Sequence, residues 1–345
     1  MATIKGTNFA DTIYQSDYNL AAVTIYAYGG NDTIKLDITD SDGGDNDVYA
    51  GAGNDTVVNN FEGGNIIDLG SGNDYYLADI KAFASKSFDK VYGGDGNDLF
   101  EINGQVSDYF GGNGNDTFLS VGYNNLFDGG NGNDTISYEI QDDYASQAGL
   151  GVTVDLNKGR AVITKDRVEI LKNIENATGT DSADDLFGNS KANVLKGLGG
   201  ADILKGFAGD DDLFGGAGDD DLFGGAGRDI LVGGLGSDYL KGEQGADTFE
   251  FDSVADSAVG AKRDVILDFS AKQGDLIDLK SIDADVYSSG DQSFSFIGGK
   301  SFSGEAGELR FSKGILSGDV DGDGRADFEI AVKGVTKMYV DDFVL

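Results

Sequence analysis

Residues 206–232, GFAGDDDLFGGAGDDDLFGGAGRDILV, repeat one nine-residue unit three times. Each unit opens with glycine, has an acidic residue at its sixth position and carries a large apolar residue at its eighth. Extending this period in both directions gives eight contiguous units over 179–250. The sixth positions are Asp184, Asn193, Asp202, Asp211, Asp220, Asp229, Asp238 and Asp247. The eighth position is Leu in the first seven units and Phe249 in the last.

The order of residues within each unit predicts its local structure. Glycines permit the positive φ angles of a tight turn, and the segment after the acidic residue is a short strand with one inward apolar side chain. Such a strand is too short to stand alone, so stacked units must bury a continuous core. Two units then form one 18-residue coil, and like turns stack at about 4.8 Å. We therefore expect an all-β chain built as a right-handed parallel β-roll.

Stacked aspartates at strand spacing repel one another unless cations lie between them. The chain has 61 acidic and 25 basic residues, a net charge of −36, and contains no His and no Cys. These absences exclude Ser-His-Asp triads, His-based zinc sites and thiolate chemistry. The remaining ligands are carboxylate, amide and carbonyl oxygens, which suit Ca²⁺. We therefore predict multiple calcium ions, held in this array by Asp184, Asp202, Asp211, Asp220, Asp229, Asp238 and Asp247.

The charge also limits the partners of the chain. Nucleic acids and anionic membranes bind basic patches, so neither is expected to bind here. No window approaches 18 apolar residues, so membrane insertion is not expected. The opening MATIKGTNFADTIY has no basic region followed by an apolar run, unlike a secretory signal peptide.

A second, less regular array precedes the first. Its glycine-rich turns end at six aspartates, the last three of them 18 residues apart: Asp32, Asp55, Asp74, Asp98, Asp116 and Asp134. We predict that these six residues are also calcium ligands. The intervening units keep an apolar eighth position, such as Tyr109 and Phe127, but lose the glycine-rich turn. The expected result is a coil with calcium turns mainly on one side and variable loops on the other.

The pattern GGxGxDxUx resembles the RTX, or haemolysin-type, calcium-binding repeat. This resemblance implies a parallel β-roll whose turns hold calcium through the sixth-position aspartate and turn carbonyls. It also implies type I secretion of an unfolded chain. Residues 138–178 interrupt the period, and GVTVDL and RAVIT within them are expected to pair as a hairpin across NKG.

Beyond Phe251 the glycine period ends, and DVILDF, GDLIDL, AGELRF and DFEIAV indicate further strands. This region resembles the C-terminal domain of serralysin-type secreted metalloproteases, which carries the secretion signal, here expected at 342–345. The absence of His means that the protease motif of that family is missing. The expected domains are an irregular roll (1–137), a connector (138–178), a regular roll (179–250) and a serralysin-like secretion domain (251–345).

Within the C-terminal region, DVDGDG places Asp319, Asp321 and Asp323 at the spacing of a calcium loop. A complete EF-hand would have Glu at the twelfth position, where this chain has Ile330, and Asp327 is available as a further ligand. Both a calcium site and a simple acidic hairpin fit this pattern.

The function expected from these features is that of a secreted, non-enzymatic, calcium-binding structural or adhesive protein, in a cell surface layer (S-layer) or biofilm matrix. Calcium, anionic polysaccharide, further copies of the chain and the type I secretion machinery are its expected partners. The alternative is a carbohydrate-binding module or polysaccharide-modifying enzyme, since glycoside chemistry needs only two carboxylates. In that alternative, six aromatic residues would form a strip on which sugars stack: Tyr75, Tyr76, Phe83, Phe88, Tyr109 and Tyr123. The competing explanation for the same residues is packing in the core and loops. A pore-forming toxin is not expected, because the repeats begin near residue 6.

Overall fold

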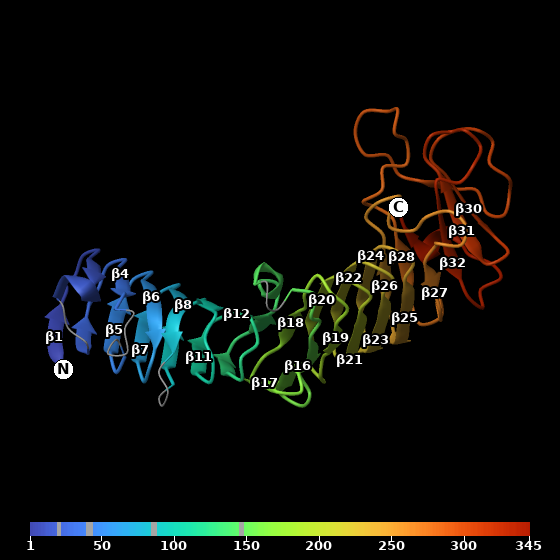
Figure 1. Ribbon diagram of the computed structural model, residues 1–345. Coiled ribbons are helices and arrows are strands. Elements are labelled where there is room, and N and C mark those ends of the chain that lie inside the picture. Colours follow the sequence, from blue (N-terminus) through green and yellow to red (C-terminus); the bar gives the residue numbers. More distant parts are fainter. Residues whose placement is uncertain (19–21, 39–43, 84–87, 145–147) are drawn as a thin grey trace. The chain divides into compact units, whose positions relative to one another are not determined.

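The computed structural model describes residues 1–18, 22–38, 44–83, 88–144 and 148–345. These residues form two compact units, Met1–Thr178 and Gly179–Leu345. Each unit is a parallel β-solenoid, which confirms the expected all-β roll (Figure 1). Three 3₁₀ turns are the helical elements of the described part: η1 (Gln15–Tyr18), η2 (Gln141–Asp143) and η3 (Val340–Asp342). Within these residues, no helix is long and apolar enough to cross a membrane.

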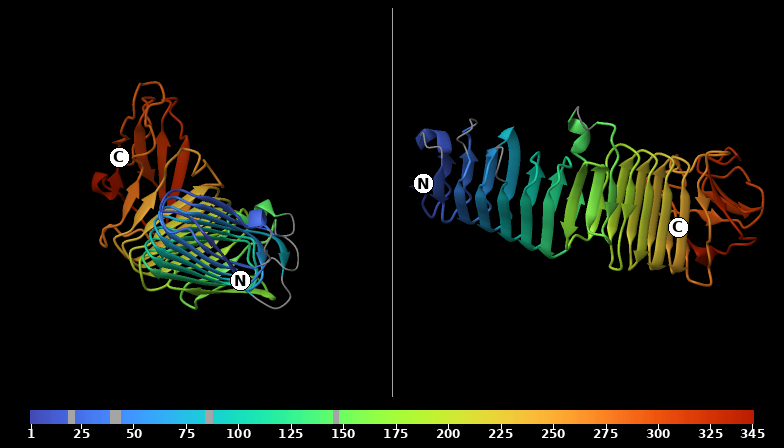
Figure 2. Two further views of the ribbon diagram at one scale, coloured as in Figure 1. Left: turned by 90° about the vertical axis from the view of Figure 1, so that its left-hand side faces the viewer. Right: turned by 60° about the horizontal axis from the view of Figure 1, so that its bottom comes forward.

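The N-terminal unit stacks its strands into two parallel sheets, which the chain visits alternately (Figure 2). The first sheet contains β1 (Ala2–Lys5), β3 (Val23–Tyr26), β5 (Asp47–Ala52), β7 (Ile66–Ser71), β9 (Lys90–Asp95), β11 (Asp108–Asn113), β13 (Leu126–Asn131) and β17 (Arg167–Lys172). The second contains β2 (Thr12–Tyr14), β4 (Thr33–Leu36), β6 (Thr56–Glu62), β8 (Tyr75–Phe83), β10 (Leu99–Ile102), β12 (Thr117–Ser120), β14 (Thr135–Ser137) and β18 (Asn176–Thr178).

The connector carries an antiparallel insertion. Strand β15 (Thr153–Asp155) pairs with β16 (Arg160–Thr164), and β16 pairs with β17. Strand β17 then lies parallel to β13 and returns the chain to the solenoid register. The segment therefore leaves the stack and rejoins it without ending the sheet.

The C-terminal unit repeats the two-sheet arrangement. Its first sheet contains β19 (Asp185–Phe187), β21 (Ile203–Ala208), β23 (Asp221–Gly227), β25 (Tyr239–Gly245), β27 (Val265–Ile266) and β32 (Phe328–Val332). Beyond β32 the sheet continues with antiparallel β31 (Ile315–Asp319) and β30 (Glu308–Ser312), and β29 (Ser295–Phe296) pairs with β30. Its second sheet contains β20 (Val194–Gly199), β22 (Asp212–Ala217), β24 (Ile230–Leu235), β26 (Thr248–Glu250), β28 (Leu276–Asp278) and β33 (Phe343–Val344). Parallel pairing thus continues past residue 250, because β28 pairs with both β26 and β33.

The eighth-position side chains form the core of each unit. In the C-terminal unit, the inward leucines from Leu186 to Leu240 and then Phe249 are fully buried. Burying one such side chain contributes about 1.5–3 kcal/mol, so no single three-residue strand is stable by itself. In the N-terminal unit, aromatic rings fill the equivalent space, with Phe118 packed 4.8 Å from Phe100 and 5.3 Å from Phe127 between ring centroids. Inward apolar packing fixes the register that aligns the turns.

Candidate calcium-binding turns

The glycine-rich turns bring a carboxylate and a carbonyl oxygen together on each rung. Gly216 and Gly218 have φ angles of 110° and 145°, which non-glycine residues rarely adopt. A Cβ added to Gly215 would overlap both Oδ2 of Asp220 and the carbonyl oxygen of Gly233 from the next rung. The first glycine of the unit is therefore required because it opens a cradle between these two oxygen atoms.

The six predicted aspartates of the N-terminal unit form one ladder. The backbone N–H of each donates to Oδ1 of the aspartate on the next rung, at 2.7–2.8 Å between nitrogen and oxygen. The ladder continues at both ends, because Asp11 N donates to Asp32 Oδ1 and Asp134 N donates to Glu175 Oε2. The structure thus brings together all six residues expected from the sequence, on one side of the solenoid.

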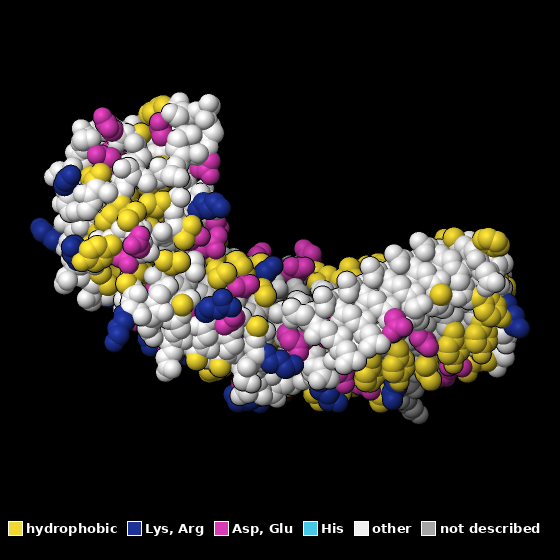
Figure 3. Space-filling model, turned by 180° about the vertical axis from the view of Figure 1, so that it is seen from behind, with side chains coloured by type: hydrophobic (Ala, Val, Ile, Leu, Met, Phe, Trp, Pro, Cys, Tyr) yellow, Lys and Arg dark blue, Asp and Glu magenta, His cyan; other side chains and the backbone are white. Residues whose placement is uncertain are grey.

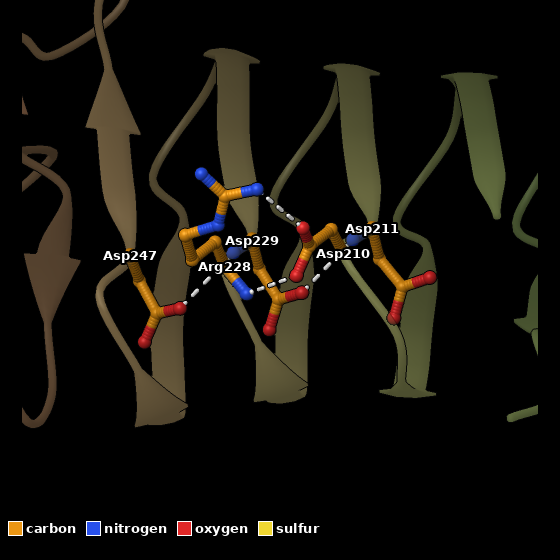
Figure 4. A network of polar contacts seen from close by, with 5 residues as sticks. All are labelled: Asp210, Asp211, Arg228, Asp229 and Asp247. Atoms are coloured by element: carbon orange, nitrogen blue, oxygen red, sulfur yellow. Dashed lines mark hydrogen bonds and ion pairs between the residues drawn. The ribbon is translucent and has the colours of Figure 1, made fainter. Parts of the chain in front are cut away.

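The C-terminal unit has two such ladders on alternate turns. One runs through Asp184, Asp202, Asp220, Asp238 and Asp264, with N–H to Oδ1 distances of 2.8–2.9 Å. The other runs through Asn193, Asp211, Asp229, Asp247 and Asp275, with distances of 2.7–3.2 Å. Figure 4 shows part of the second ladder, where the exposed ion pair of Arg228 with Asp210 lies beside Asp229.

The second oxygen of most ladder aspartates is buried and has no hydrogen-bond partner among the described residues. This holds for Oδ2 of thirteen residues: Asp32, Asp55, Asp74, Asp98, Asp116, Asp134, Asp202, Asp211, Asp220, Asp229, Asp238, Asp247 and Asp264. A buried polar atom without a partner is costly and therefore rare. Thirteen such oxygens, aligned in rows beside turn carbonyls, fit calcium ions, which bind six to eight oxygens.

Burial also disfavours the charged form of these carboxyls in the ion-free fold. Desolvation raises the pKa of Asp202 to about 8, with smaller contributions from the charges of Asp220 and Asp184. It raises the pKa of Asp211, Asp238 and Asp247 to about 7. A bound divalent cation would reverse this effect by favouring the carboxylate form.

Other buried carboxylates in the same protein have protein partners. Asp89 accepts hydrogen bonds from Asn65 N at 2.7 Å and Asn59 Nδ2 at 2.8 Å. Glu169 accepts from the Tyr138 hydroxyl at 2.7 Å and Ser120 Oγ at 3.0 Å. These two carboxylates are thus satisfied by protein groups, whereas every buried carboxylate oxygen without a partner among the described residues belongs to a ladder.

The opposite side of the N-terminal unit carries a mostly neutral ladder. Asn46, Asn65, Asp89, Ser107 and Asn125 occupy the equivalent positions and make the same backbone N–H to side-chain oxygen bonds, at 2.7–3.1 Å. Acidic ladder positions therefore lie mainly on the other side of this unit, where the sequence predicts the calcium turns. Because amide and hydroxyl groups replace most carboxylates, this side needs no cation for charge balance.

Three ladder ends are satisfied by nearby backbone, whereas Asp264, the last residue of its ladder, keeps an Oδ2 without a partner among the described residues. The N–H of Thr7 donates to Oδ2 of Asp11, and the N–H of Thr180 donates to Oδ2 of Asp184 at 2.6 Å. At the other end, Ser270 N donates to Oδ2 of Asp275 at 2.8 Å. Asp184, a predicted ligand, therefore differs from the residues whose Oδ2 is unpartnered.

Glu175, Asp264 and Asp275 belong to the ladders, although the glycine-based pattern did not identify them. Asp264 and Asp275 are each followed by x-U, in DVI and DLI, so that shorter signal could have found both. Glu175 has no such signal, because it reaches the ladder from the connector.

The DVDGDG loop brings three carboxylates within 4.8 Å of one another: Asp319, Asp321 and Asp327. Asp319 is fully buried and accepts hydrogen bonds from Gly322 N and Gly324 N at 2.8 and 2.9 Å. Asp323, the third ligand expected from the spacing, is not part of this group and instead accepts from Arg325 N. The assignment of calcium to this loop stays a prediction.

The six aromatic residues considered as a sugar-binding strip do not share one surface. Tyr76 and Tyr109 are fully buried core residues, whereas Phe88 is exposed. The side chain of Phe83 lies outside the described part of the structure. Core packing, the competing explanation, holds for the two buried tyrosines.

Parallel solenoids with aspartate-lined glycine turns define a class of calcium-binding repeat protein, and sequence comparison agrees. The family model of the RTX calcium-binding nonapeptide repeat matches residues 21–37, 40–58, 82–101, 110–145, 178–213, 187–222, 214–249 and 223–257. The chain therefore carries RTX repeats and binds calcium at several sites.

One similar solved structure is the solution structure of the AlgE6R3 subunit from the Azotobacter vinelandii mannuronan C5-epimerase. Its sequence is 28% identical, and the match covers 48% of this chain and 78% of that chain with a TM-score of 0.28. No curated protein matches the chain.

Proposed function

We propose that the protein is a secreted, non-enzymatic structural or adhesive component of a cell surface layer or biofilm matrix, which folds when it meets extracellular calcium. The supporting observation is the row of buried aspartate oxygens without protein partners. An ion-free chain would have to bury these charges uncompensated, in a molecule that already carries a net charge of −36.

Calcium then acts as the switch between an export-competent chain and a folded one. A ligand that binds only the folded state stabilises it by RT ln(1 + [L]/Kd), so its effect grows with the calcium concentration. Calcium is scarce inside cells and millimolar outside them. A chain with weak carbonyl-rich sites would stay unfolded during type I secretion and fold after it.

Binding free energy becomes folding free energy in such a system. The C-terminal unit carries calcium ladders on both of its turn rows, whereas the N-terminal unit carries one calcium ladder and one neutral ladder. We expect the C-terminal unit to depend more steeply on calcium, because both of its rows bury unpartnered carboxylates.

The adhesive part of the proposal rests on charge. A surface rich in carboxylates repels anionic polysaccharide and other copies of the same chain in the absence of divalent cations, and calcium can bridge such surfaces. The expected partners are therefore anionic polysaccharide and further copies of this chain.

Sedimentation velocity and circular dichroism of the purified chain, first in EDTA and then in about 5 mM calcium, test the proposal at a concentration above the weak end of extracellular affinities. Magnesium at the same concentration is the control for ionic strength. We expect an expanded species in EDTA and magnesium, and a compact one in calcium that assembles into large particles. A chain that is equally compact in EDTA would refute the calcium switch, and a calcium-bound monomer that binds no anionic polysaccharide would refute the adhesive role.

A further inference from the structure

An outward-facing column of aromatic residues runs along the first sheet of the N-terminal unit. In register, neighbouring strands contribute Tyr26, Tyr49, Asp68, Tyr92 and Phe110. Tyr49 and Tyr92 are 37% and 38% exposed, so their rings are accessible from solvent. Hydrophobic and acidic side chains lie together along the surface of this unit (Figure 3). Each of these five positions carries a ring except Asp68, where an acid replaces it.

The rings on either side of Asp68 form two parallel, stacked pairs. Tyr26 and Tyr49 are stacked at 5.0 Å between centroids with an interplanar angle of 7°. Tyr92 and Phe110 are stacked at 4.9 Å with an angle of 11°. Because these spacings match the distance between strands, the faces of Tyr49 and Tyr92 are turned toward the rung of Asp68.

Tyr49, Asp68 and Tyr92 therefore form a slot with two aromatic walls and a carboxylate floor, which we call the Asp68 slot. Its walls are two rungs apart, about 9.6 Å at ordinary strand spacing. Carbon atoms in contact are about 3.5–4.0 Å apart, so the slot accepts one layer of atoms and not two. A group at its centre would lie about 4.8 Å from each ring, within the range of cation–π attraction.

The C-terminal unit contains the same arrangement with its cation built in. Phe187, Lys205 and Phe223 occupy three successive rungs of an outward column. The Lys205 ammonium lies 5.7 Å from the Phe187 ring centroid and 5.1 Å from that of Phe223. This fold thus places an ammonium between two rings that are two rungs apart. The Asp68 slot has tyrosines in place of the two phenylalanines and a carboxylate in place of the lysine.

The side chain of Asp68 forms no hydrogen bond or ion pair with any described residue. Asp128, which continues the same column, differs because it accepts a hydrogen bond from Asn173 Nδ2 at 2.7 Å and is aligned with Lys172 on the next strand. A single carboxylate offers calcium at most two of the six to eight oxygens that it requires. The walls are aromatic and the floor is anionic, so the complementary ligand is an organic cation.

We propose that the Asp68 slot binds an arginine or lysine side chain of a basic partner polypeptide. The charged group would lie between Tyr49 and Tyr92, as the Lys205 ammonium lies between its two phenylalanines, and would pair with the Asp68 carboxylate. A slot one rung wide admits the tip of a long side chain more readily than a pyranose ring with substituents on every carbon. The partner is therefore a protein and not an amino-sugar polymer.

Titration of the calcium-loaded full chain with acetyl-Gly-Arg-Gly-amide tests this proposal, with ¹³C-labelled tyrosine ring resonances as the readout. The matched probe replaces arginine by citrulline, which keeps the shape of the side chain and removes its charge. Asp68→Asn should weaken binding of the arginine peptide by about fivefold, the magnitude of one exposed cation–π or ion-pair contact. Asp128→Asn removes the same charge from the same column and should change affinity less than about twofold.

Asp68→Lys provides an independent test, because it reproduces the arrangement seen at Lys205. This variant should keep the calcium-bound circular dichroism spectrum, lose peptide binding and melt at a higher temperature than the wild type. Equal losses in Asp68→Asn and Asp128→Asn, or equal binding of the arginine and citrulline peptides, would overturn the proposal. Tighter binding of a glucosamine dimer than of the arginine peptide would also overturn it, since the partner would then be a sugar.

Discussion

Asp220→Asn should have opposite effects on the ion-free and calcium-bound forms. Asp220 lies in the middle of a ladder, where its Oδ1 accepts the N–H of Asp202 at 2.8 Å and its Oδ2 is buried without a partner among the described residues. Asn keeps the first acceptor and removes the charge from the second position. Asn193, which occupies an equivalent position in the other ladder, shows that the turn accommodates an amide.

The size of the ion-free effect follows from burial. Desolvation raises the pKa of Asp220 from 3.8 to about 6, and one pKa unit corresponds to about 1.4 kcal/mol. At pH 8 the charged carboxylate therefore costs the ion-free fold roughly 3 kcal/mol, which the amide would remove. In calcium the same change removes a charged ligand. A loss of about 1.4 kcal/mol or more at this site would weaken its calcium affinity at least tenfold and so raise the calcium midpoint of folding.

Circular dichroism can measure both effects. Ion-free stability is compared in EDTA at pH 8 by titrating trimethylamine oxide, which favours compact states, and calcium dependence is measured without the osmolyte. Asp219→Asn is the control, because Asp219 is exposed on the same turn and the substitution removes the same charge. We expect the Asp220 variant to fold at a lower osmolyte concentration than the control in EDTA. In the calcium titration it should need a higher calcium concentration than the control. An unchanged calcium midpoint in the Asp220 variant would refute the role of Asp220 as a ligand. A smaller folded fraction of this variant in EDTA would refute the free-energy cost assigned to the buried charge.

Three further outcomes are expected. In EDTA, acidification from pH 8 to pH 5 should increase the folded fraction, because the ladder carboxyls have higher pKa values in the ion-free fold than in the unfolded chain and so bind protons on folding. In calcium, the same acidification should raise the calcium midpoint of folding, which a pH series of circular dichroism titrations would measure. Gly111→Ala should raise the calcium midpoint, because the new Cβ would overlap Oδ2 of Asp116, whereas the Cβ in Gly29→Ala meets only ordinary van der Waals contact and should change the midpoint little. Similar calcium midpoints for both variants would count against the cradle. Asp327→Asn should remove one calcium ion from the stoichiometry measured by equilibrium dialysis, and Asp323→Asn should not. Loss of a calcium ion in the Asp323 variant alone would contradict the grouping of Asp327, and not Asp323, with the other carboxylates of the DVDGDG loop.

Much of the fold could be predicted because its determinants are local. The nine-residue period specifies a turn, a short strand and one inward side chain, and stacking of identical units follows from the need to bury that side chain. The repeated aspartates at the sixth position, in a chain without His or Cys, also indicate calcium before any coordinates are known. The same pattern distinguishes the calcium side of the N-terminal array from its neutral side, where Asn65 and Asn125 replace the acids.

Only the tertiary structure decided which of these carboxylates lack protein partners. Asp184 and Asp202 look equivalent in the repeat, yet Thr180 donates to the second oxygen of Asp184 and no described residue donates to that of Asp202. One ladder end depends on a contact between residues far apart in sequence, that of Asp134 with Glu175. No local period encodes such contacts.

The outward columns likewise depend on register between strands. Tyr49, Asp68 and Tyr92 are separated by irregular loops in the sequence, and only parallel pairing aligns them on successive rungs. Tyr76 and Tyr109 face the core because strand alternation turns them inward. Local spacing thus determined the repeating unit and its ion, whereas the stacking of loops of unequal length decided which side chains meet.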